Sequence, residues 1–149
     1  MRQKQVQEYP QLAVSVALRN RDGQTFLLVK RGRAPSKGMW AFAGGRVEFG
    51  ETMRDAAQRE LYEETGLLAD ELTLCEQMEF IQTADTQEQP AHHYVLNVFT
   101  GIGFGTPKPA DDADDAQWLS LDDMRGLPVT ASTLNVCKKL SAQNPIKEM

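Results

Sequence analysis

The sequence predicts an α/β or α+β fold in which helices cover a mixed β-sheet. Four apolar runs have the composition of strands, at residues 12–20, 25–32, 71–82 and 92–101. Two segments, 52–65 and about 130–142, have the apolar spacing of helices. Because strands stand before and between these helices, layers of helix against sheet are the arrangement that buries their apolar faces.

The first half of the chain begins with a hairpin. LAVSVALRN and TFLLVKRG flank Asp22-Gly23, a dipeptide that is typical of tight hairpin turns. Residues 33–51 are rich in glycine, so we expect mainly loop there, with a short strand around Trp40–Phe42. Thr52 is the expected N-cap of the helix that follows, with Asp55 as its capping-box partner.

The second half adds strands and a last helix. Gly66 is the residue expected just past the end of the first helix. The acidic stretch ADDADDA precedes AQWLSL, which predicts a short strand. Thr130 or Ser132 is expected to cap the last helix. Its apolar residues, Leu134, Cys137 and Leu140, follow helical spacing and predict packing on the sheet.

Length and charge limit the kind of protein. We expect one domain over residues 1–149, with 1–9 as a loose lead-in. The net charge of -5 argues against bulk electrostatic binding to nucleic acid or to an anionic membrane. No apolar run approaches membrane-spanning length, which favours a soluble, cytoplasmic protein. The two cysteines, Cys75 and Cys137, are expected to be free thiols rather than a disulfide.

The stretch RELYEETG carries three glutamates, Glu60, Glu63 and Glu64, within an arc of about 100° on a helix. Like charges at this spacing are mildly destabilising, and a solvated acidic face is the simplest interpretation. A glycine-rich loop, GGRVEFGE, runs directly into the helix, and Arg59 is well placed to hold Glu51 across the junction. Clustered carboxylate oxygens suit Mg²⁺ or Mn²⁺ rather than zinc.

The same region resembles a known motif at nine positions. The Nudix box, G-x5-E-x7-R-E-U-x-E-E-x-G-U with U aliphatic, is matched by Gly45, Glu51, Arg59, Glu60, Leu61, Glu63, Glu64, Gly66 and Leu67. The chain therefore resembles a Nudix hydrolase, and similarity to the usual sequence around the box covers most of residues 11–140. Ala43 departs from the pattern, since many members carry Pro there.

The resemblance implies an α/β/α sandwich and hydrolysis of a nucleoside diphosphate linked to another moiety. Glu60 and Glu64 would be the principal metal ligands, and Glu63 a third ligand or the holder of the metal-bound water. A backbone carbonyl of Gly44 or Gly45 would complete the set of protein ligands to the metal ion. The residues that we expect in catalysis are Glu63, Glu60 and Arg59, and the structural residues are Glu51 and Gly66.

The resemblance identifies the general base and the phosphate-binding residues less directly than it identifies the metal ligands. Glu63 is our first candidate for the base. Acids outside the box, which could equally be solvated loop residues, are Glu88, Asp112 and Asp115. The expected substrate-binding residues are Arg31, Lys37, Arg46 and Gly45, with Arg33 a further cation and surface solubility the competing explanation. Trp40 and Trp118 are expected to be core anchors, and His92 and His93 structural strand residues.

The resemblance favours the ADP-ribose pyrophosphatase-like group, and so the cleavage of ADP-ribose to AMP and ribose 5-phosphate. The alternative is removal of pyrophosphate from ordinary or oxidised nucleoside triphosphates. A non-catalytic binding module and an acidic scaffold for a protein partner are further alternatives, but neither needs the complete set of glutamates. The expected partner is a small nucleotide rather than a nucleic acid or a membrane. Relatives are frequently dimers, so a homodimer stays open.

Overall fold

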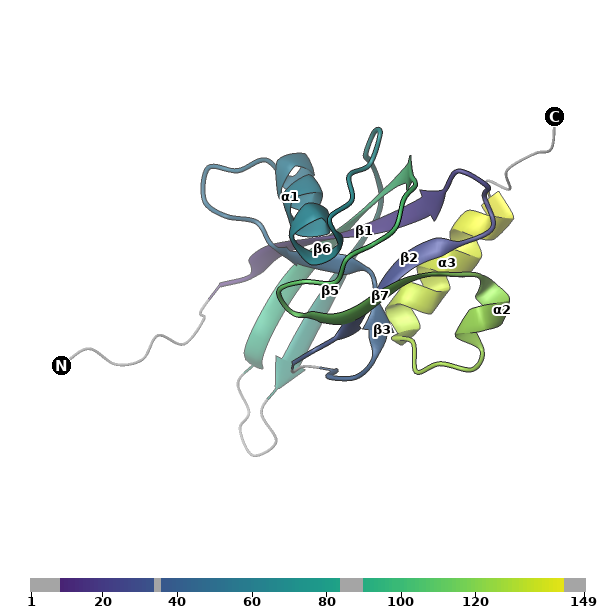
Figure 1. Cartoon of the computed structure of the whole chain (residues 1–149). Helices are drawn as coiled ribbons and strands as arrows, with labels where there is room; N and C mark the ends of the chain where they lie inside the picture. Colours follow the sequence, from purple (N-terminus) through teal and green to yellow (C-terminus); the bar gives the residue numbers. More distant parts are fainter. Residues whose placement is uncertain (1–8, 34–35, 84–89, 144–149) are drawn as a thin grey trace.

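The described part of this computed structural model, residues 9–33, 36–83 and 90–143, forms one mixed β-sheet with helices on both faces (Figure 1). The strands are β1 Gln11–Asn20, β2 Phe26–Arg31, β3 Trp40–Ala41, β4 Ala43–Arg46, β5 Thr73–Thr83, β6 Pro90–Gly103 and β7 Ala113–Leu119. The helices are α1 Met53–Thr65, α2 Leu121–Met124 and α3 Ala131–Gln143. The predicted mixed sheet covered by helices is therefore confirmed.

Strand β1 organises the sheet. The main path runs β3-β2-β1-β6-β5, in which β1 and β6 are parallel and the other pairs are antiparallel. On its other side β1 pairs with β2 at Arg19 and with β4 from Ala13 to Val16. Because β2 leaves β1 after this short contact, β4 can lie beside the first half of β1. Strand β7 pairs with β2 on its outer side.

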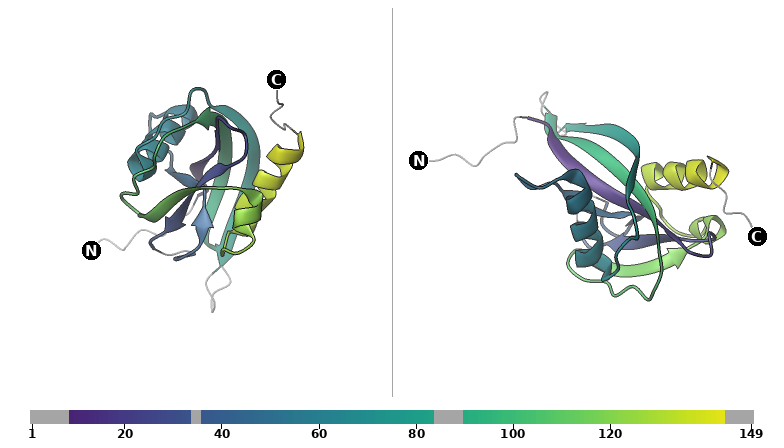
Figure 2. Two further views of the ribbon diagram at one scale, coloured as in Figure 1. Left: turned by 45° about the vertical axis from the view of Figure 1, so that its right-hand side comes forward. Right: turned by 90° about the horizontal axis from the view of Figure 1, so that it is seen from above.

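The two larger helices pack on opposite faces of the sheet (Figure 2). On one face α1 places Ala56, Ala57 and Leu61 against apolar residues of β1 and β2. On the other face α3 places Val136, Cys137 and Leu140 against Ala17, Phe26, Leu28 and Val98. The expected packing of α3 through its Leu134, Cys137 and Leu140 stripe is confirmed, and α3 begins directly after Thr130.

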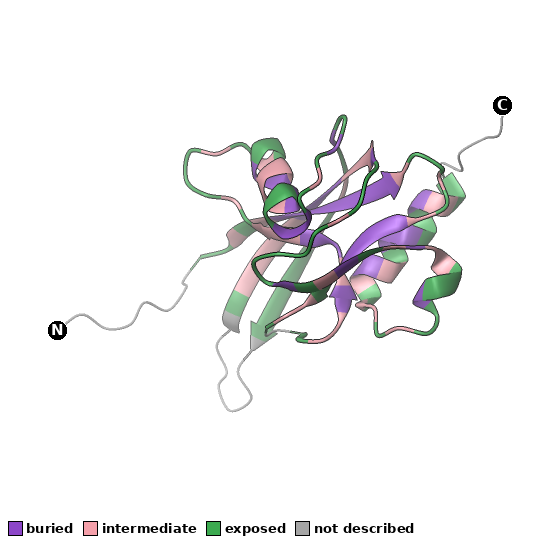
Figure 3. Ribbon diagram, viewed as in Figure 1, coloured by how far each residue is buried: buried purple, intermediate pink, exposed green. Residues whose placement is uncertain are grey.

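The burial pattern separates this core from two exposed regions, the loop that enters α1 and the outer part of the β5–β6 hairpin (Figure 3). Trp40 is a core residue, as expected. Trp118 is only partly buried: it packs on the edge of the α1-side core, and its indole Nε1 donates to the Gly105 carbonyl. Both cysteines are free thiols. The prediction for residues 1–9 falls mostly outside the described residues.

The described part of residues 33–51 is mainly loop, as predicted, but it contains one strand that was not predicted. Besides the expected short strand, found at Trp40–Ala41, residues Ala43–Arg46 form strand β4. The reason is tertiary: the small residues of β4 gain their backbone partners from β1, which lies far away in sequence. This strand is the element that positions the glycine pair of the box.

Candidate active site

Strand β4 brings Gly44 and Gly45 directly beneath helix α1. A Cβ atom on Gly45 would overlap the carboxylate of Glu60, and one on Gly44 would overlap the carbonyl oxygen of Val14. The backbone N–H of Gly44 donates to the carboxylate of Glu64. Both positions therefore require glycine because strand, helix and carboxylates approach one another so closely.

Helix α1 has the ends that the sequence predicts. Thr52 is the N-cap, and its Oγ1 accepts from the N–H of Asp55 at 3.0 Å. Gly66 ends the helix in the left-handed conformation, with φ of 75°, and its N–H donates to Tyr62. The packing of the apolar face of α1 on the sheet fixes the rotation of the helix, so that Glu64 is buried, Glu60 is half-buried and Glu63 lies at the exposed edge.

Arg59 connects the entering loop to the helix through five hydrogen bonds. Its guanidinium binds both carboxylate oxygens of Glu51, at 2.7 and 2.9 Å, which confirms the expected pair. It also donates to Glu60 at 3.1 Å, to Glu63 at 3.3 Å and to the carbonyl of Arg46 at 3.0 Å. The planar fork of arginine suits such bidentate contacts. Arg59 therefore fixes strand β4, the loop and two glutamates together.

Glu51 closes the same loop on itself. One of its carboxylate oxygens accepts from the N–H of Glu48 at 3.0 Å, and its own N–H donates to the Glu48 carbonyl at 2.9 Å. The hydrogen bonds from Arg59, and then the one from Glu48, lower the pKa of Glu51 to about 2. Glu51 thus stays charged and anchors the loop to Arg59.

Glu60 and Glu64 form the chemically unusual pair of the site. Their carboxyl groups share a hydrogen bond, so one of them holds a proton. Burial, together with the hydrogen bond and charge of Glu60, raises the pKa of Glu64 to about 9. Burial also raises the pKa of Glu60, although Arg59 opposes the shift. Arg59 supplies one positive charge here, and a second would neutralise the carboxylate charge that Arg59 leaves uncompensated.

A divalent cation fits these residues by its chemistry. The donors are carboxylate oxygens beside backbone groups of a glycine strand, the set that Mg²⁺ and Mn²⁺ prefer. As they stand, however, no three His, Cys, Asp or Glu side chains among the described residues are arranged to hold a metal ion. Glu63 is drawn to Arg59 instead. Cation binding therefore requires Glu63, or another oxygen donor, to turn toward Glu60 and Glu64.

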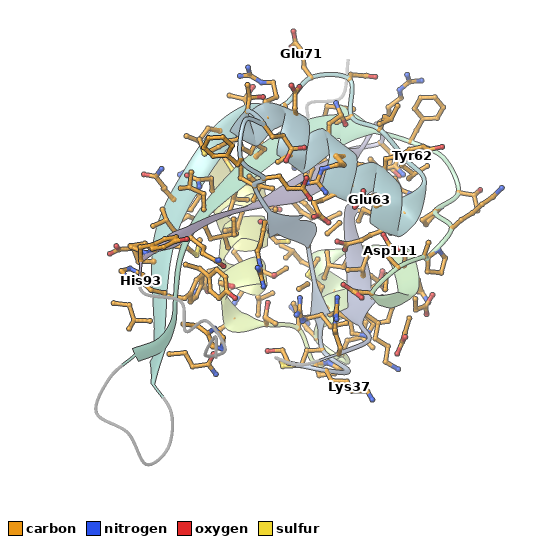
Figure 4. All side chains as sticks on the ribbon, turned by 90° about the vertical axis from the view of Figure 1, so that its left-hand side faces the viewer. Lys37, Tyr62, Glu63, Glu71, His93 and Asp111 are labelled. Atoms are coloured by element: carbon orange, nitrogen blue, oxygen red, sulfur yellow. The ribbon has the colours of Figure 1, made fainter. Side chains whose placement is uncertain are left out.

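A second loop reaches the far end of α1. The N–H groups of Lys108 and Ala110 donate to the carbonyls of Thr65 and Glu64, at 2.8 and 3.1 Å. The segment then places Asp112 where its charge contributes to the raised pKa of Glu64. Figure 4 shows Asp111 of this segment and Glu63 of α1 on the same side of the molecule. Of the predicted acids outside the box, Asp112 is thus brought to the site.

The remaining predicted residues divide between the site and its surroundings. Arg46 is exposed, and its carbonyl is held by Arg59. Arg31 is half-buried at the end of β2, and Lys37 is exposed and separated from Glu63 in Figure 4. Asp115 accepts hydrogen bonds from Ala116 and Gln117 of its own strand.

The other side chains that the sequence singled out are one acid, Glu88, and two histidines, His92 and His93. Glu88 lies outside the described residues. His93 lies 3.4 Å from Glu79 across the β5–β6 ladder, and the ring of His92 stacks on Tyr94. Both histidines are therefore strand residues, as predicted.

Replacing Gly45 by alanine is expected to damage the site without unfolding the protein. The new methyl group would overlap the Glu60 carboxylate, so Glu60 must move away from Glu64. We expect turnover to fall at least about ten-fold while the melting temperature changes by only a few degrees. Gly126→Ala is the matched control, because nothing lies within 4 Å of its Cβ position. Equal activity of the two variants would contradict the close approach.

The stability of the metal-free protein is expected to decrease as pH rises from 5 to 9. A carboxyl group with a raised pKa stabilises the folded state below its ordinary value, and this contribution is lost toward the higher pKa, here about 9 for Glu64. The measurement is the melting temperature in EDTA across this range, repeated with Mg²⁺. We expect Mg²⁺ to flatten the decrease, because it stabilises the charged carboxylates.

Between pH 5 and 9 the change in stability reports on the Glu60–Glu64 pair and not on the other groups with shifted pKa values. Glu51, whose pKa is lowered to about 2, contributes stability that is lost only below its ordinary value of 4.5. Burial raises the pKa values of Cys75 and Cys137, but thiols act only above their ordinary value of 9.0. A melting temperature in EDTA that is flat or rises between pH 5 and 9 would contradict the buried pair.

A mixed sheet between helices, with two adjacent glutamates over a glycine strand, defines the general class as an α/β sandwich with a carboxylate-rich site. The matches to known proteins make this specific. Residues 9–136 match the family model described as the NUDIX domain. A crystal structure of a MutT NUDIX hydrolase from Burkholderia pseudomallei superposes with a TM-score of 0.76 and 30% identity, covering 89% of this chain and 99% of that one. The chain belongs to the NUDIX hydrolase family.

Curated relatives differ in what they act on. The ADP-ribose pyrophosphatase of Methanocaldococcus jannaschii is 36% identical over 99 residues, 66% of this chain and 56% of that protein. The oxidized purine nucleoside triphosphate hydrolase of Danio rerio is 33% identical over 101 residues, 67% of this chain and 60% of that protein. The chain thus matches little more than half the length of either relative. Among the described residues, no helix has the length and apolar character that crossing a bilayer requires.

Proposed function

We propose that this chain is a divalent-cation-dependent pyrophosphohydrolase that cleaves a nucleoside diphosphate linked to another moiety. The observation that carries the proposal is the Glu60–Glu64 pair, in which Glu64 is buried and Glu60 half-buried; the pair shares a hydrogen bond and lies against the glycine strand. A protein has no structural reason to bury two carboxyl groups side by side, because their desolvation is costly. A pyrophosphate-bound cation supplies that reason.

The residues have distinct roles in this proposal. Glu60 and Glu64 hold the cation, which is Mg²⁺ or Mn²⁺, and a backbone carbonyl of Gly44 or Gly45 assists. The bound cation would neutralise phosphate oxygens and lower the pKa of an attacking water. Glu63 is the proposed general base, since it lies at the exposed edge of the helix where a water can approach. Arg59 positions Glu60 and Glu63 and holds the loop.

The leading substrate is ADP-ribose, with AMP and ribose 5-phosphate as products. The Methanocaldococcus relative supports this choice by the activity in its name. The second candidate is a nucleoside triphosphate, ordinary or oxidised, which the Danio relative supports in the same way. The expected phosphate contacts are Arg31, Lys37, Arg46 and the backbone at Gly45, of which Arg46 lies on the strand beneath α1.

One panel of substrates tests the activity. Purified protein is incubated with ADP-ribose, NADH, diadenosine polyphosphates or each (d)NTP, with Mg²⁺ or Mn²⁺ and again with EDTA, and the products are separated by chromatography. We expect AMP and ribose 5-phosphate from ADP-ribose, and no products in EDTA. Pyrophosphate and a nucleoside monophosphate as the main products would instead select the second candidate. Absence of metal-dependent turnover throughout the panel would overturn the proposed function.

We also propose that residues 1–149 form a single catalytic domain that acts on small nucleotides in the cytoplasm, as Mg²⁺-dependent nucleotide chemistry and two free thiols favour. The sequence leaves a homodimer open as the alternative to a monomer. Light scattering on the purified protein gives the mass directly, and a value near 16.6 kDa would contradict the dimer.

A further inference from the structure

Residues 108–112, here called the bridging segment, connect the carboxyl end of α1 to the end of β2. At one end Lys108 and Ala110 donate to the helix carbonyls. At the other end the carbonyl of Asp112 accepts from the N–H of Gly32 at 2.8 Å. Between them Asp111 adopts a left-handed backbone with φ of 55°, which turns the chain. The position of Asp112 is therefore fixed from both sides.

Asp112 has two charged neighbours of opposite sign. Its carboxylate binds Nη2 of Arg33 at 2.7 Å, and on the other side its charge acts on Glu64. Arg33 follows β2 at the start of the connection to β3, 79 positions before Asp112. In the metal-free protein Arg33 is thus the counter-charge of a carboxylate whose segment is hydrogen-bonded to the backbone of Glu64 through Ala110.

The Arg33–Asp112 pair is accessible to water and easily broken. The side chains are 70% and 56% exposed, and pairs so accessible to water contribute little to stability. Neither side chain has another hydrogen-bond partner among the contacts of the described residues. Breaking the pair therefore costs little. A divalent cation between Asp112 and Glu64 would interact more strongly, because it carries two charges and faces two carboxylates.

We propose that Asp112 exchanges Arg33 for the divalent cation when the site fills, and that the released guanidinium of Arg33 then binds a phosphate of the substrate. The inference rests on the proposed cation-dependent function. It makes Arg33 a residue that couples the two ligands, since its planar fork matches phosphate oxygens as well as it matches a carboxylate. Cation and substrate phosphate should consequently strengthen each other's binding.

The first test measures cation binding without turnover. Mn²⁺ is titrated calorimetrically into the wild type, Arg33→Gln, Asp112→Asn and the double variant, with Arg125→Gln as control. Arg125 also forms an exposed pair, with Asp122 on α2, and both side chains are 83% exposed. We expect Arg33→Gln to bind Mn²⁺ about two- to five-fold more tightly, the range that an exposed ion pair supports. Asp112→Asn should bind it more weakly, and Arg33→Gln should have no effect in that background.

The second test measures the phosphate contact. The probe is α,β-methylene-ADP, whose P–C–P link resists hydrolysis, titrated with and without Mn²⁺. We expect Mn²⁺ to tighten probe binding to the wild type and to Arg125→Gln, but much less to Arg33→Gln. Failure of Mn²⁺ to bind the wild type would overturn the proposed function. Normal Mn²⁺ binding that Arg33→Gln changes no more than Arg125→Gln would overturn the exchange alone.

Discussion

Replacing Glu64 by glutamine is expected to abolish turnover and yet to stabilise the metal-free protein. Glu64 is buried, and burial with the adjacent Glu60 raises its pKa to about 9. At neutral pH the folded state must therefore bind a proton that the unfolded chain does not hold, which costs about 1–3 kcal/mol. An amide of the same shape removes this cost. It still accepts from the Gly44 N–H, but it is a poor ligand for Mg²⁺.

The two effects have opposite signs, so they are measured together. In EDTA at pH 8 we expect the melting temperature to rise by several degrees, and with Mg²⁺ we expect kcat/KM to fall at least about 100-fold. Glu71→Gln is the control, since Glu71 is exposed and lies far from Glu63 in Figure 4. A lower melting temperature of the Glu64 variant in EDTA would show that its charge is stabilising, contrary to the structure.

Replacing Arg59 by alanine is expected to cause the largest loss of stability among the site variants. The substitution removes five hydrogen bonds and leaves Glu51, Glu60 and Glu63 without their common counter-charge. Because the pairs are partly exposed, we expect a loss of about 2–3 kcal/mol, or roughly 5–10 °C in melting temperature. Turnover should fall as well, since the loop and Glu60 lose their fixed position.

Arg59→Lys separates charge from geometry. Lysine keeps the positive charge but lacks the fork that binds both oxygens of Glu51, so we expect only a part of the stability to return. Arg125→Ala is the control, because an ion pair this exposed contributes little. Full recovery with lysine would show that the charge alone matters and that the bidentate contact is dispensable.

The box helix could be predicted from sequence because its determinants are local. Thr52 and Gly66 cap the helix, and Arg59 reaches Glu51 only eight positions away. Spacing along one helix therefore defined both the glutamate arc and the anchor. Glu63 follows Arg59 by four positions, so their ion pair is a local contact as well, although Glu63 was expected to face a metal ion or its bound water.

The rest of the site depends on contacts between distant parts of the chain. Strand β4 has a composition typical of loops, and only its ladder with β1 makes it a strand. Asp112 stood in the sequence as one of several acids in ADDADDA, and nothing local distinguishes it from Asp115. What distinguishes it is the backbone bond to Gly32 and the pair with Arg33, which only the folded chain supplies.

The bridging segment also limits how this protein can vary in length. Surface connections usually tolerate insertions, because few of their backbone groups are bonded. Here the number of residues from Lys108 to Asp112 is constrained, because Lys108 is hydrogen-bonded to a carbonyl of α1 and Asp112 is hydrogen-bonded to Gly32. An added residue between Thr106 and Lys108 would leave the bonds of Ala110 and Asp112 in place. A residue added after Ala110 would instead displace the Asp112 carboxylate. Two neighbouring positions of one loop therefore differ in whether they tolerate an insertion.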